Sequence, residues 1–297
     1  DMKRVNVLMS TYNGQDYIKD QIESILNQTY HNIKLYVRDD GSTDRTLDIL
    51  QCYEQQNKIV FIKGNNVGYG ASFMQLLLEA EDSDYWAFSD QDDVWDREKI
   101  KRAVMQLEQM DQDTPAMYCH NYYITDQRLQ ITGKSGLTQE DYPFYKAITE
   151  CIHLGFATVI NRKLRELMLL ANGRELISHD WWAELIATEF GTIYVDPYMG
   201  AWHRRLDNSV SGGNLTSRFK WLWNSLKNET EIHNLTENFW IVFQNKMKNN
   251  DEIILSWFVS GKYNLGKALR KVFYYRRWRT SLASEVVVRF LMLIGKI

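Results

Sequence analysis

Four times within residues 5–110, a short apolar run is followed by a polar loop and then by a pattern with helical spacing. Each run is four or five residues long, the length and content expected of a buried strand. Repeated units of this kind predict a mostly parallel, doubly wound α/β sheet with helices on both faces. Ligands of such sheets bind at the edge where the strands end, which is where the polar loops lie. The runs are residues 5–9, 33–37, 59–62 and 85–88.

The loop after the fourth run is acidic and reads Ser89-Asp90-Gln91-Asp92-Asp93-Val94-Trp95. Three carboxylates within four positions repel one another, and a turn from a strand to a helix does not need them. Hard divalent cations bind such oxygen ligands and usually complete their shell with water and substrate phosphates. The alternative is an acidic turn whose last Asp caps the next helix, predicted over residues 96–110.

Composition limits the classes of protein. A chain of 297 residues with 44% hydrophobic side chains can bury the core of one large or two modest domains. The net charge of -3 argues against nucleic-acid binding, and 10 Trp and 17 Tyr are common where sugars or ring systems are bound. Three widely spaced cysteines fit no disulfide framework, which favours a reducing cytoplasm. We expect no signal peptide and no membrane span, because no apolar run reaches about 18 residues.

The polar loops lack the glycine patterns G-x-G-x-x-G and G-x-x-x-x-G-K-S/T, so hydride transfer and ATP hydrolysis lack their usual signatures. The loops instead carry Asp and Asn. A carboxylate such as Asp40 can accept from the N3–H of a pyrimidine, and short polar turns at strand ends can hold a ribose. The alternative for residues 39–42 is a turn followed by a helix cap.

Beyond residue 110 the pattern is less regular. We expect strands at 116–119, 153–160 and 192–195, a loop-rich stretch at 121–150, and a helix at 162–171 closed by Gly173. Another helix begins at Ser178-His179-Asp180-Trp181-Trp182. Asp180 is either the N-cap of this helix or a general base held at its start, beside two indoles able to stack on a sugar face.

The segment Trp202-His203-Arg204-Arg205 combines a further candidate metal ligand, His203, with two arginines able to hold diphosphate oxygens. A His among arginines is also a common surface feature. After Gly212-Gly213 the patterns are helical and aromatic, over 216–228, 230–249 and 251–260, with a basic stretch at 267–279 and an apolar one at 286–294. We therefore expect a catalytic domain at 1–212 and a helical domain at 213–297.

From Lys262 onward, the chain contains nine Lys and Arg and one acidic residue, Glu285. The helical domain could pack on the catalytic domain, bind acceptor or a second subunit, or dock reversibly on an anionic membrane. Acceptor binding or homo-oligomer formation is the favoured interpretation.

Five motifs together resemble those of family 2 glycosyltransferases of the GT-A fold, in the family's order over residues 3–212. They are Ser10-Thr11-Tyr12-Asn13, the run 39–44, Asn66 with Gly68, Ser89-Asp90-Gln91-Asp92-Asp93 with Trp95 and Lys99, and His179-Asp180. The form Ser-Asp-Gln-Asp-Asp-Val-Trp is most similar to rhamnosyl- and glucosyltransferases of bacterial surface polysaccharides and glycoproteins.

The resemblance implies a role for each matching residue. Nucleotide contacts would come from Ser10, Thr11, Tyr12, Asp40, Asn66, Gly68 and Asp90. Asp92 would bind Mn²⁺ or Mg²⁺, with His203 as a second ligand, and Asp180 would deprotonate the acceptor hydroxyl. Donor and acceptor sugars would meet Asp93, Trp95, His179, Trp181 and Trp182, and the diphosphate would meet Arg204 and Arg205. Related sequences often place a His where this chain has Arg205. In this chain, either His203 takes the role of that His or an arginine replaces it.

The predicted function is therefore a metal-dependent, inverting glycosyltransferase. Its donor would be a UDP-hexose or dTDP-rhamnose, and its acceptor a hydroxyl of a growing glycan on a protein or lipid carrier. We expect it in the cytoplasm or at the inner face of the membrane, with at most peripheral membrane contact. The alternatives are a nucleotidyltransferase, which would need a basic, glycine-rich triphosphate loop near the first strand, and a non-catalytic sugar-binding module.

Overall fold

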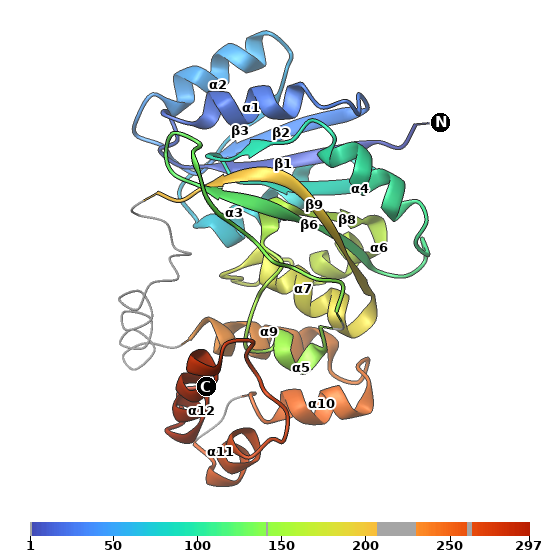
Figure 1. The fold of residues 1–297 in the computed structure, drawn as a ribbon, viewed down its shortest axis with the longest axis vertical. Coiled ribbons are helices and arrows are strands. Elements are labelled where there is room, and N and C mark those ends of the chain that lie inside the picture. Colours follow the sequence, from blue (N-terminus) through green and yellow to red (C-terminus); the bar gives the residue numbers. More distant parts are fainter. Residues whose placement is uncertain (1, 141, 207–229, 260–262) are drawn as a thin grey trace.

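A computed structural model describes residues 2–140, 142–206, 230–259 and 263–297 (Figure 1). The predicted helix at 216–228 and the Gly212-Gly213 boundary lie outside the described residues. The strands are β1 (Val5–Thr11), β2 (Ile33–Asp39), β3 (Val60–Lys63), β4 (Tyr85–Ser89), β5 (Val94–Trp95), β6 (Ala116–Thr125), β7 (Ile131–Lys134), β8 (Thr158–Asn161) and β9 (Thr192–Arg204). The helices of the α/β part are α1 (Ile18–Leu26), α2 (Thr46–Gln55), α3 (Tyr69–Glu79), α4 (Lys99–Leu107), α5 (Phe144–Ala147), α6 (Arg162–Met168) and α7 (His179–Phe190). The C-terminal helices are α9 (Glu231–Phe243), α10 (Asn249–Ser256), α11 (Leu265–Val272) and α12 (Leu282–Leu293).

The described strands form one sheet in the order β3-β2-β1-β4-β8-β6-β9-β5, with β7 added to β6. β1 pairs in parallel with β2 and with β4, and β2 pairs in parallel with β3. The four predicted strand–loop–helix units are therefore confirmed, and their loops lie at one edge. The α/β fold class and the C-terminal helices are confirmed as well.

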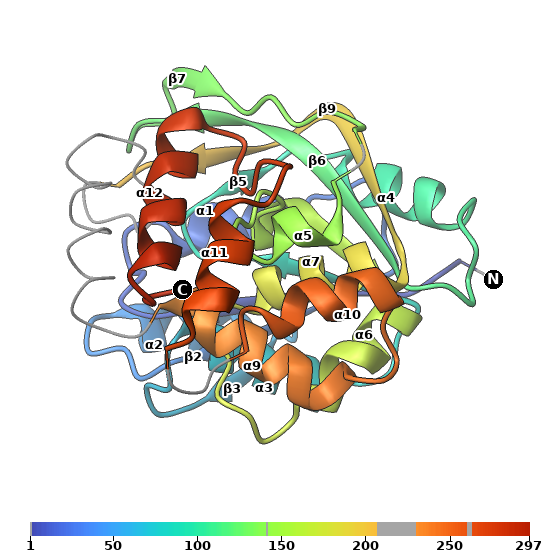
Figure 2. The same ribbon diagram turned by 90° about the horizontal axis from the view of Figure 1, so that it is seen from below.

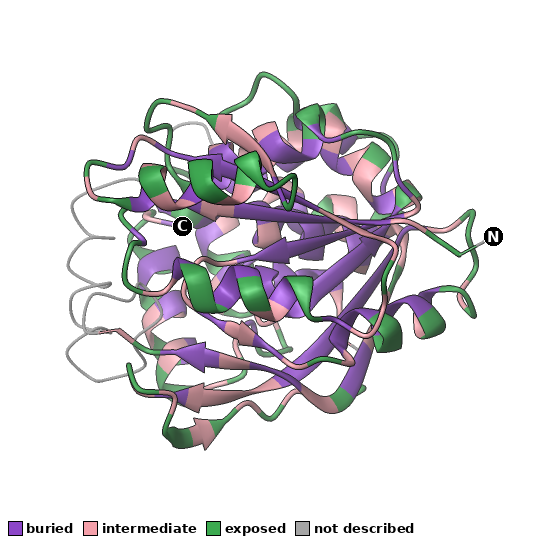
Figure 3. Cartoon of the chain, turned by 90° about the horizontal axis from the view of Figure 1, so that it is seen from above, coloured by how far each residue is buried: buried purple, intermediate pink, exposed green. Residues whose placement is uncertain are grey.

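Alternation along β1 explains why helices cover both faces of the sheet. Val5, Val7 and Met9 are fully buried in a cluster with apolar residues of α1, α2 and α4. Leu8 points to the other face and is buried in a cluster with residues of α3, α6 and α7. Successive side chains of a strand point to opposite faces, so a strand buried on both sides is apolar at nearly every position. The central strands are accordingly buried along most of their length (Figure 3).

The second half of the sheet differs from the prediction. The stretch predicted to be loop-rich begins inside the ten-residue β6 and continues into β7, which pairs antiparallel with it. The predicted strand at 153–160 is a 3₁₀ turn, Gly155–Ala157, followed by the short β8. A Cβ on Gly155 would lie 2.7 Å from His179 Nε2, so this turn packs closely against the start of α7.

β9 is much longer than the predicted strand at 192–195. Its register against β6 shifts between His120 and Asn121, which leaves Pro197 within an irregularity where its missing N–H costs no ladder hydrogen bond. β9 then continues far enough for Trp202 and Ala201 to pair antiparallel with Val94 and Trp95 of β5. This pairing joins the acidic loop to the end of β9, although the two are about 110 residues apart in the chain.

The start of α7 also corrects a prediction, because Ser178 and not Asp180 is the N-cap. The Ser178 side chain accepts from the backbone N–H of Trp181. Asp180 lies in the first turn, where the exposed N–H groups of a helix favour a carboxylate.

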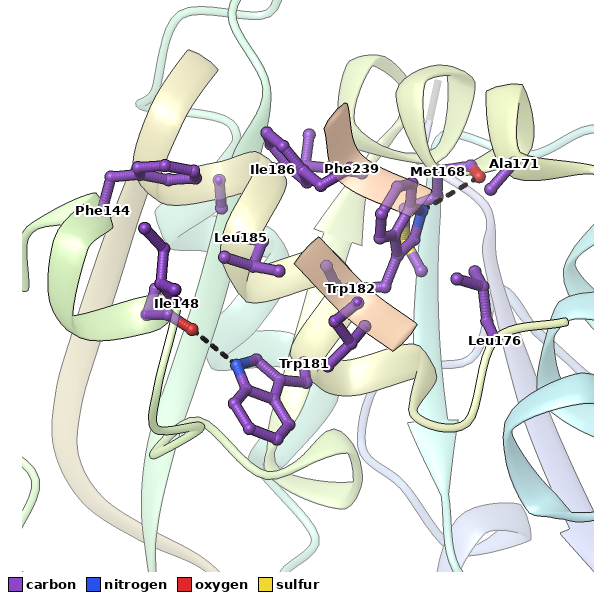
Figure 4. Packing of buried hydrophobic residues seen from close by; sticks show 14 of the residues in the cluster. Phe144, Ile148, Met168, Ala171, Leu176, Trp181, Trp182, Leu185, Ile186 and Phe239 are labelled. Carbon is purple, nitrogen blue, oxygen red and sulfur yellow. Dashed lines mark hydrogen bonds between the residues drawn. The ribbon is translucent and has the colours of Figure 1, made fainter. Parts of the chain in front are cut away.

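The C-terminal helices share a core with the α/β part. The Trp182 ring contacts Phe239 and Phe243 of α9, with centroids 5.5 and 5.8 Å apart. Figure 4 shows the Trp182 ring beside Phe239, with its Nε1 donating to the carbonyl of Met168. α9 and α10 therefore cover apolar residues of α7 that would otherwise face solvent.

Glu189, near the end of α7, predicts a pH effect on stability. Burial raises the pKa of Glu189 to about 7, although the backbone N–H of Lys248 donates to it. The folded chain thus keeps a proton that the unfolded chain releases above pH 4.5, so stability falls as pH rises through this window. We expect Glu189→Gln to stabilise the protein by about 1–2 kcal/mol more at about pH 8 than at about pH 5. Chemical denaturation at both pH values measures this difference, with Glu175→Gln on an exposed loop as the control.

Candidate active site

The end of β1, the loops that follow β1, β2, β3 and β4, and the start of α3 line a cavity of ≈ 310 Å³. All seven residues predicted to contact a nucleotide line this cavity, because the carboxyl ends of neighbouring parallel strands meet there. The complete lining is Ser10, Thr11, Tyr12, Asp40, Asn66, Gly68, Tyr69, Phe73, Asp90, Gln91 and Asp92.

Asp40 organises one wall of the cavity. Its carboxylate accepts from Arg38 Nη1 at 2.5 Å and from the backbone N–H groups of Val67 and Gly68, each at 3.0 Å. Gly68 has a φ of +83°, a conformation that side chains disfavour. Asp40 thus holds the loop before α3 while it borders the cavity. The sequence interpretation did not select Arg38, whose buried position on β2 only the fold reveals.

Gln91 fixes the opposite wall. Its Oε1 accepts from Thr11 Oγ1 at 2.6 Å and from the Tyr12 N–H at 3.0 Å, and its Nε2 donates to the Tyr12 carbonyl at 3.0 Å. The Tyr12 side chain remains 47% exposed. Its ring is therefore free to contact a planar group that enters the cavity. Gln91 was also missed, because its contacts join two loops that are distant in sequence.

Three side chains beside the cavity could hold a metal ion. Ligand atoms of Asp90, Asp93 and His203 all lie within 4.8 Å of one another. Asp93 is fully buried, and its Oδ1 lies 2.8 Å from His203 Nδ1 while its Oδ2 has no hydrogen-bond partner. A buried carboxylate oxygen without a partner is costly, and a divalent cation would satisfy it. Two carboxylates and an imidazole suit Mn²⁺ or Mg²⁺, so the residues present fit such an ion.

The electrostatics of this cluster reflect crowded negative charge. Burial raises the pKa of Asp90 well above its usual range, and the charges of Asp93 and Asp92 raise it further. Burial, with the charge of Asp93, also raises the pKa of Asp92 to about 6. For His203, burial lowers the pKa, but the hydrogen bond to Asp93 and the nearby carboxylates outweigh it and raise the pKa overall. A cation would relieve this repulsion.

Lys99 is a buried cation near the same carboxylates. Its Nζ donates to the Phe156 carbonyl at 2.6 Å and lies 3.3 Å from the centre of the Trp95 ring. Burial lowers the pKa of Lys99 well below its usual range, while the charges of Asp93 and Asp90 oppose that shift.

Asp92, the residue predicted to bind the metal, lies outside the cluster of three. Its side chain lines the cavity, and its backbone carbonyl accepts from Arg204 Nη1 at 2.9 Å. Arg204 does not reach toward the cavity as predicted for a diphosphate ligand, because it is buried and also pairs with Asp20 at 2.7 Å. Arg205 is exposed at the end of the described β9 segment. His203, and not Arg205, therefore joins the acidic cluster.

Asp180 is not part of the cavity lining, but its charge acts on Tyr69, which is. Its carboxylate accepts from the Gly155 N–H at 3.1 Å, from Ser178 Oγ at 2.5 Å and from the Trp181 N–H at 2.9 Å. The charge of Asp180 adds to the burial effects that raise the pKa of Tyr69 and of Asp90, which places it within electrostatic reach of both. Asp180 is half-buried, so it can still meet a ligand.

Four aromatic residues predicted to contact sugars are buried instead. Trp182 is fully buried among apolar residues, and Trp181 donates through Nε1 to the Ala147 carbonyl (Figure 4). Trp95 lies beneath Lys99. His179 stacks on Phe73 with ring centroids 3.9 Å apart, and burial lowers its pKa to about 4. Asp93, also predicted to meet a sugar, belongs to the acidic cluster. In this structure these side chains are buried and do not line the cavity.

The sheet order, the cavity at the strand ends and the neighbouring acidic cluster agree with the GT-A fold that the sequence motifs implied. The family model described as "Glycosyl transferase family 2" matches residues 6–167, more than half of the chain. The chain belongs to this family.

Curated relatives agree with this assignment. The dTDP-rhamnosyl transferase RfbG of Shigella flexneri is 28% identical over 221 residues, which are 72% of this chain and 76% of the relative. The UDP-Glc:alpha-D-GlcNAc-diphosphoundecaprenol beta-1,3-glucosyltransferase WfaP of Escherichia coli is 33% identical over 159 residues, 54% of this chain and 61% of the relative.

Solved structures share the fold. Residues 1–349 of S. aureus TarS, in complex with UDP-GlcNAc, match with a TM-score of 0.54 at 15% identity, over 98% of this chain and 91% of that TarS fragment. The mannosyltransferase PcManGT from Pyrobaculum calidifontis, in complex with GDP-Man and Mn²⁺, matches with a TM-score of 0.53 at 16% identity, over 100% of this chain and 89% of PcManGT. In the part of the chain that the structure describes, no helix is both long and apolar enough to cross a bilayer.

Proposed function

We propose that this chain is a metal-dependent, inverting glycosyltransferase that uses UDP-hexose or dTDP-rhamnose. The observation that carries the proposal is one cavity lined by all seven predicted nucleotide contacts, beside the cluster of Asp90, Asp93 and His203. The Tyr12 ring would lie against the pyrimidine of the nucleotide. The Asp40 carboxylate would accept a hydrogen bond from the N3–H of that pyrimidine. The names of RfbG and WfaP, which specify dTDP-rhamnosyl and UDP-Glc transfer, support these two donor classes.

Asp90, Asp93 and His203 would hold Mn²⁺ or Mg²⁺, with Asp92 as a further carboxylate on the cavity side. A bound divalent cation would neutralise charge on the departing diphosphate. The exposed Arg205 would add positive charge near the same oxygens.

Asp180 would act as the base. In a single displacement, the acceptor oxygen bonds to the anomeric carbon while the bond from that carbon to the phosphate oxygen breaks. The acceptor proton passes to Asp180, and the anomeric configuration inverts. Three hydrogen bonds orient the Asp180 carboxylate, which keeps its position as the acceptor approaches.

The acceptor would be a hydroxyl of a glycan on a lipid or protein carrier. The name of WfaP specifies a diphosphoundecaprenol-linked sugar, which supports a lipid carrier. The C-terminal helices, as a domain at 213–297 that packs on a donor-binding domain at 1–212, would help to bind it. Burial, and then the charge of Asp180, raise the pKa of Glu231, so the start of α9 lies within electrostatic reach of the proposed base. The three cysteines are free, as a cytoplasmic location would require.

The proposal is tested by incubating the purified chain and Mn²⁺ with UDP-glucose or dTDP-rhamnose, with and without a lipid-diphosphate-linked sugar. We expect acceptor-dependent release of the nucleoside diphosphate. Donor binding is measured in parallel by thermal shift, where a ligand at 100 times its Kd stabilises by about 2.7 kcal/mol. Binding without release from either donor would favour a non-catalytic sugar-binding module, and pyrophosphate release from a nucleoside triphosphate would favour a nucleotidyltransferase.

A further inference from the structure

The last described helix, α12, exposes an apolar stripe. Leu282, Val286, Phe290 and Leu293 follow one another at successive turns and are 69%, 70%, 49% and 42% exposed. Residues at this spacing lie on one face of a helix. The stripe therefore faces outward along the whole length of α12.

The other face of α12 is firmly packed. Val288, Leu291 and Met292 are buried in the core that also contains Phe258 and Trp278. Glu285 accepts from Arg289 Nε at 2.6 Å and from the Arg279 N–H at 2.7 Å. Because these contacts fix the orientation of the helix, exposure of the stripe is a property of the packed fold.

The neighbouring α11 adds to the apolar surface. Leu265 and Phe273 are exposed at its two ends, and Leu269 is exposed between them. Tyr275 follows and is 80% exposed. α11 and α12 lie next to each other at the C-terminal end of the molecule (Figure 2). Large apolar side chains are thus exposed on both of two helices that pack against each other.

Positive charge accompanies these residues. From Lys262 to the end of the chain there are nine Lys and Arg, and the only acidic residue, Glu285, is buried and paired within the fold. Arg270, Arg276 and Arg277 are exposed. Exposed basic residues thus lie in the same C-terminal segment as the apolar stripe.

We propose that α11 and α12 dock the protein on an anionic lipid surface, with the apolar side chains entering the interface and the basic residues facing lipid phosphates. Amphipathic helices with Lys, Arg and large apolar residues bind membranes in this way. A second copy is a poorer occupant, because a symmetric contact would bring two strongly basic segments together. The contact is peripheral, since the described helices cannot cross a bilayer.

The position of these helices gives docking a consequence for catalysis. The parallel strands point toward the side of the molecule where the C-terminus lies, and α12 lies on that side below the sheet (Figures 1 and 3). Docking would bring the edge with the cavity near the lipid. A lipid-carried acceptor would then reach the site without leaving the bilayer.

The test is co-flotation of the full chain with phosphatidylglycerol–phosphatidylcholine vesicles and with pure phosphatidylcholine vesicles, without nucleotide or acceptor. We expect binding to the anionic vesicles only, weakened by salt because surface charges are screened. Val286→Glu with Phe290→Glu should reduce partitioning at least about tenfold, since the pair loses apolar transfer and adds negative charge. The matched control is Ile241→Glu with Ile253→Glu, which changes residues 50% and 55% exposed on α9 and α10 and should bind like the wild type.

Reversal of basic charge is the second arm. Arg270→Glu with Arg277→Glu should weaken binding to anionic vesicles by about tenfold or more, as two basic residues near the surface are lost. The control is Arg128→Glu with Arg174→Glu, which makes the same charge change at exposed positions elsewhere. This control should bind anionic vesicles like the wild type.

Equal binding to both vesicle types, or unchanged binding of the Val286–Phe290 variant, would overturn the proposal. A wild-type dimer in sedimentation that this variant converts to monomer, without vesicle binding by either protein, would assign the stripe to a second copy instead. Because the assay contains no substrate, its result is independent of whether the chain transfers a sugar.

Discussion

Asp180→Asn is expected to lower turnover by about 10²–10⁴-fold while donor binding stays close to that of the wild type. The amide nearly preserves the shape of the carboxylate and can still accept from the Trp181 N–H, but it cannot take the acceptor proton. One hydrogen bond, such as that from the Gly155 N–H, would be lost, at a stability cost of about 1 kcal/mol. Turnover is measured as acceptor-dependent release of nucleoside diphosphate, and donor binding by calorimetry.

Ser178→Ala is the control for this variant. It removes the N-cap of α7 and the 2.5 Å hydrogen bond to Asp180, at a similar cost of about 1 kcal/mol, but leaves the carboxylate in place. We expect its turnover to stay within about tenfold of the wild type. Wild-type transfer by Asp180→Asn would mean that another group is the base, and equal losses in both variants would mean that Asp180 has only a structural role.

Asp93→Asn is expected to weaken the Mn²⁺ affinity of the nucleotide complex by more than about 100-fold, because it neutralises the oxygen that has no partner in the fold. The variant should fold, since the amide oxygen can still pair with His203. Titration calorimetry of Mn²⁺ in the presence of UDP measures the change. Asp20→Asn is the control. It removes a carboxylate that pairs with Arg204 and lies outside the cluster of three, so this variant should bind Mn²⁺ like the wild type.

Comparison with Asp92→Asn separates the two assignments of the metal. The family resemblance implies that Asp92 is the ligand, whereas the cluster of three contains Asp93. We expect a smaller loss of Mn²⁺ affinity for Asp92→Asn, because its carboxylate reaches the ion only from the cavity side. A larger loss of Mn²⁺ affinity for Asp92→Asn than for Asp93→Asn would mean that Asp92 is the principal metal ligand.

The nucleotide cavity could be predicted from sequence because its residues occupy equivalent places in a repeated unit. Ser10 lies near the end of β1, and Asp40, Asn66 and Asp90 follow β2, β3 and β4. Parallel pairing brings the ends of such strands to one edge, so local patterns predicted a ligand site there, and the family resemblance supplied the individual nucleotide contacts. The family motifs extended this prediction to the class of enzyme, which the family match confirms.

The acidic cluster required the tertiary structure. The β5–β9 pairing sets Asp93 against His203, 110 residues away, and leaves Asp92 facing the cavity. In a two-residue strand, no apolar alternation is long enough to reveal pairing, and the irregularity at Pro197 shifts the register of β9. A second irregularity, between Asn121 and Tyr123, shifts the register by one more position, and a shift of one position reverses which side chains face inward.

The burial of the aromatic residues could not be predicted from the sequence either. The sequence determined that Trp181 and Trp182 lie at the start of a helix, but it could not decide whether they face a sugar or a core. α9, more than forty residues further along, buries Trp182, and the carbonyl of Ala147, the last residue of α5, accepts a hydrogen bond from Trp181. Local periodicity depends on neighbouring residues, whereas burial depends on which distant surface packs against them, and only the folded chain determines that.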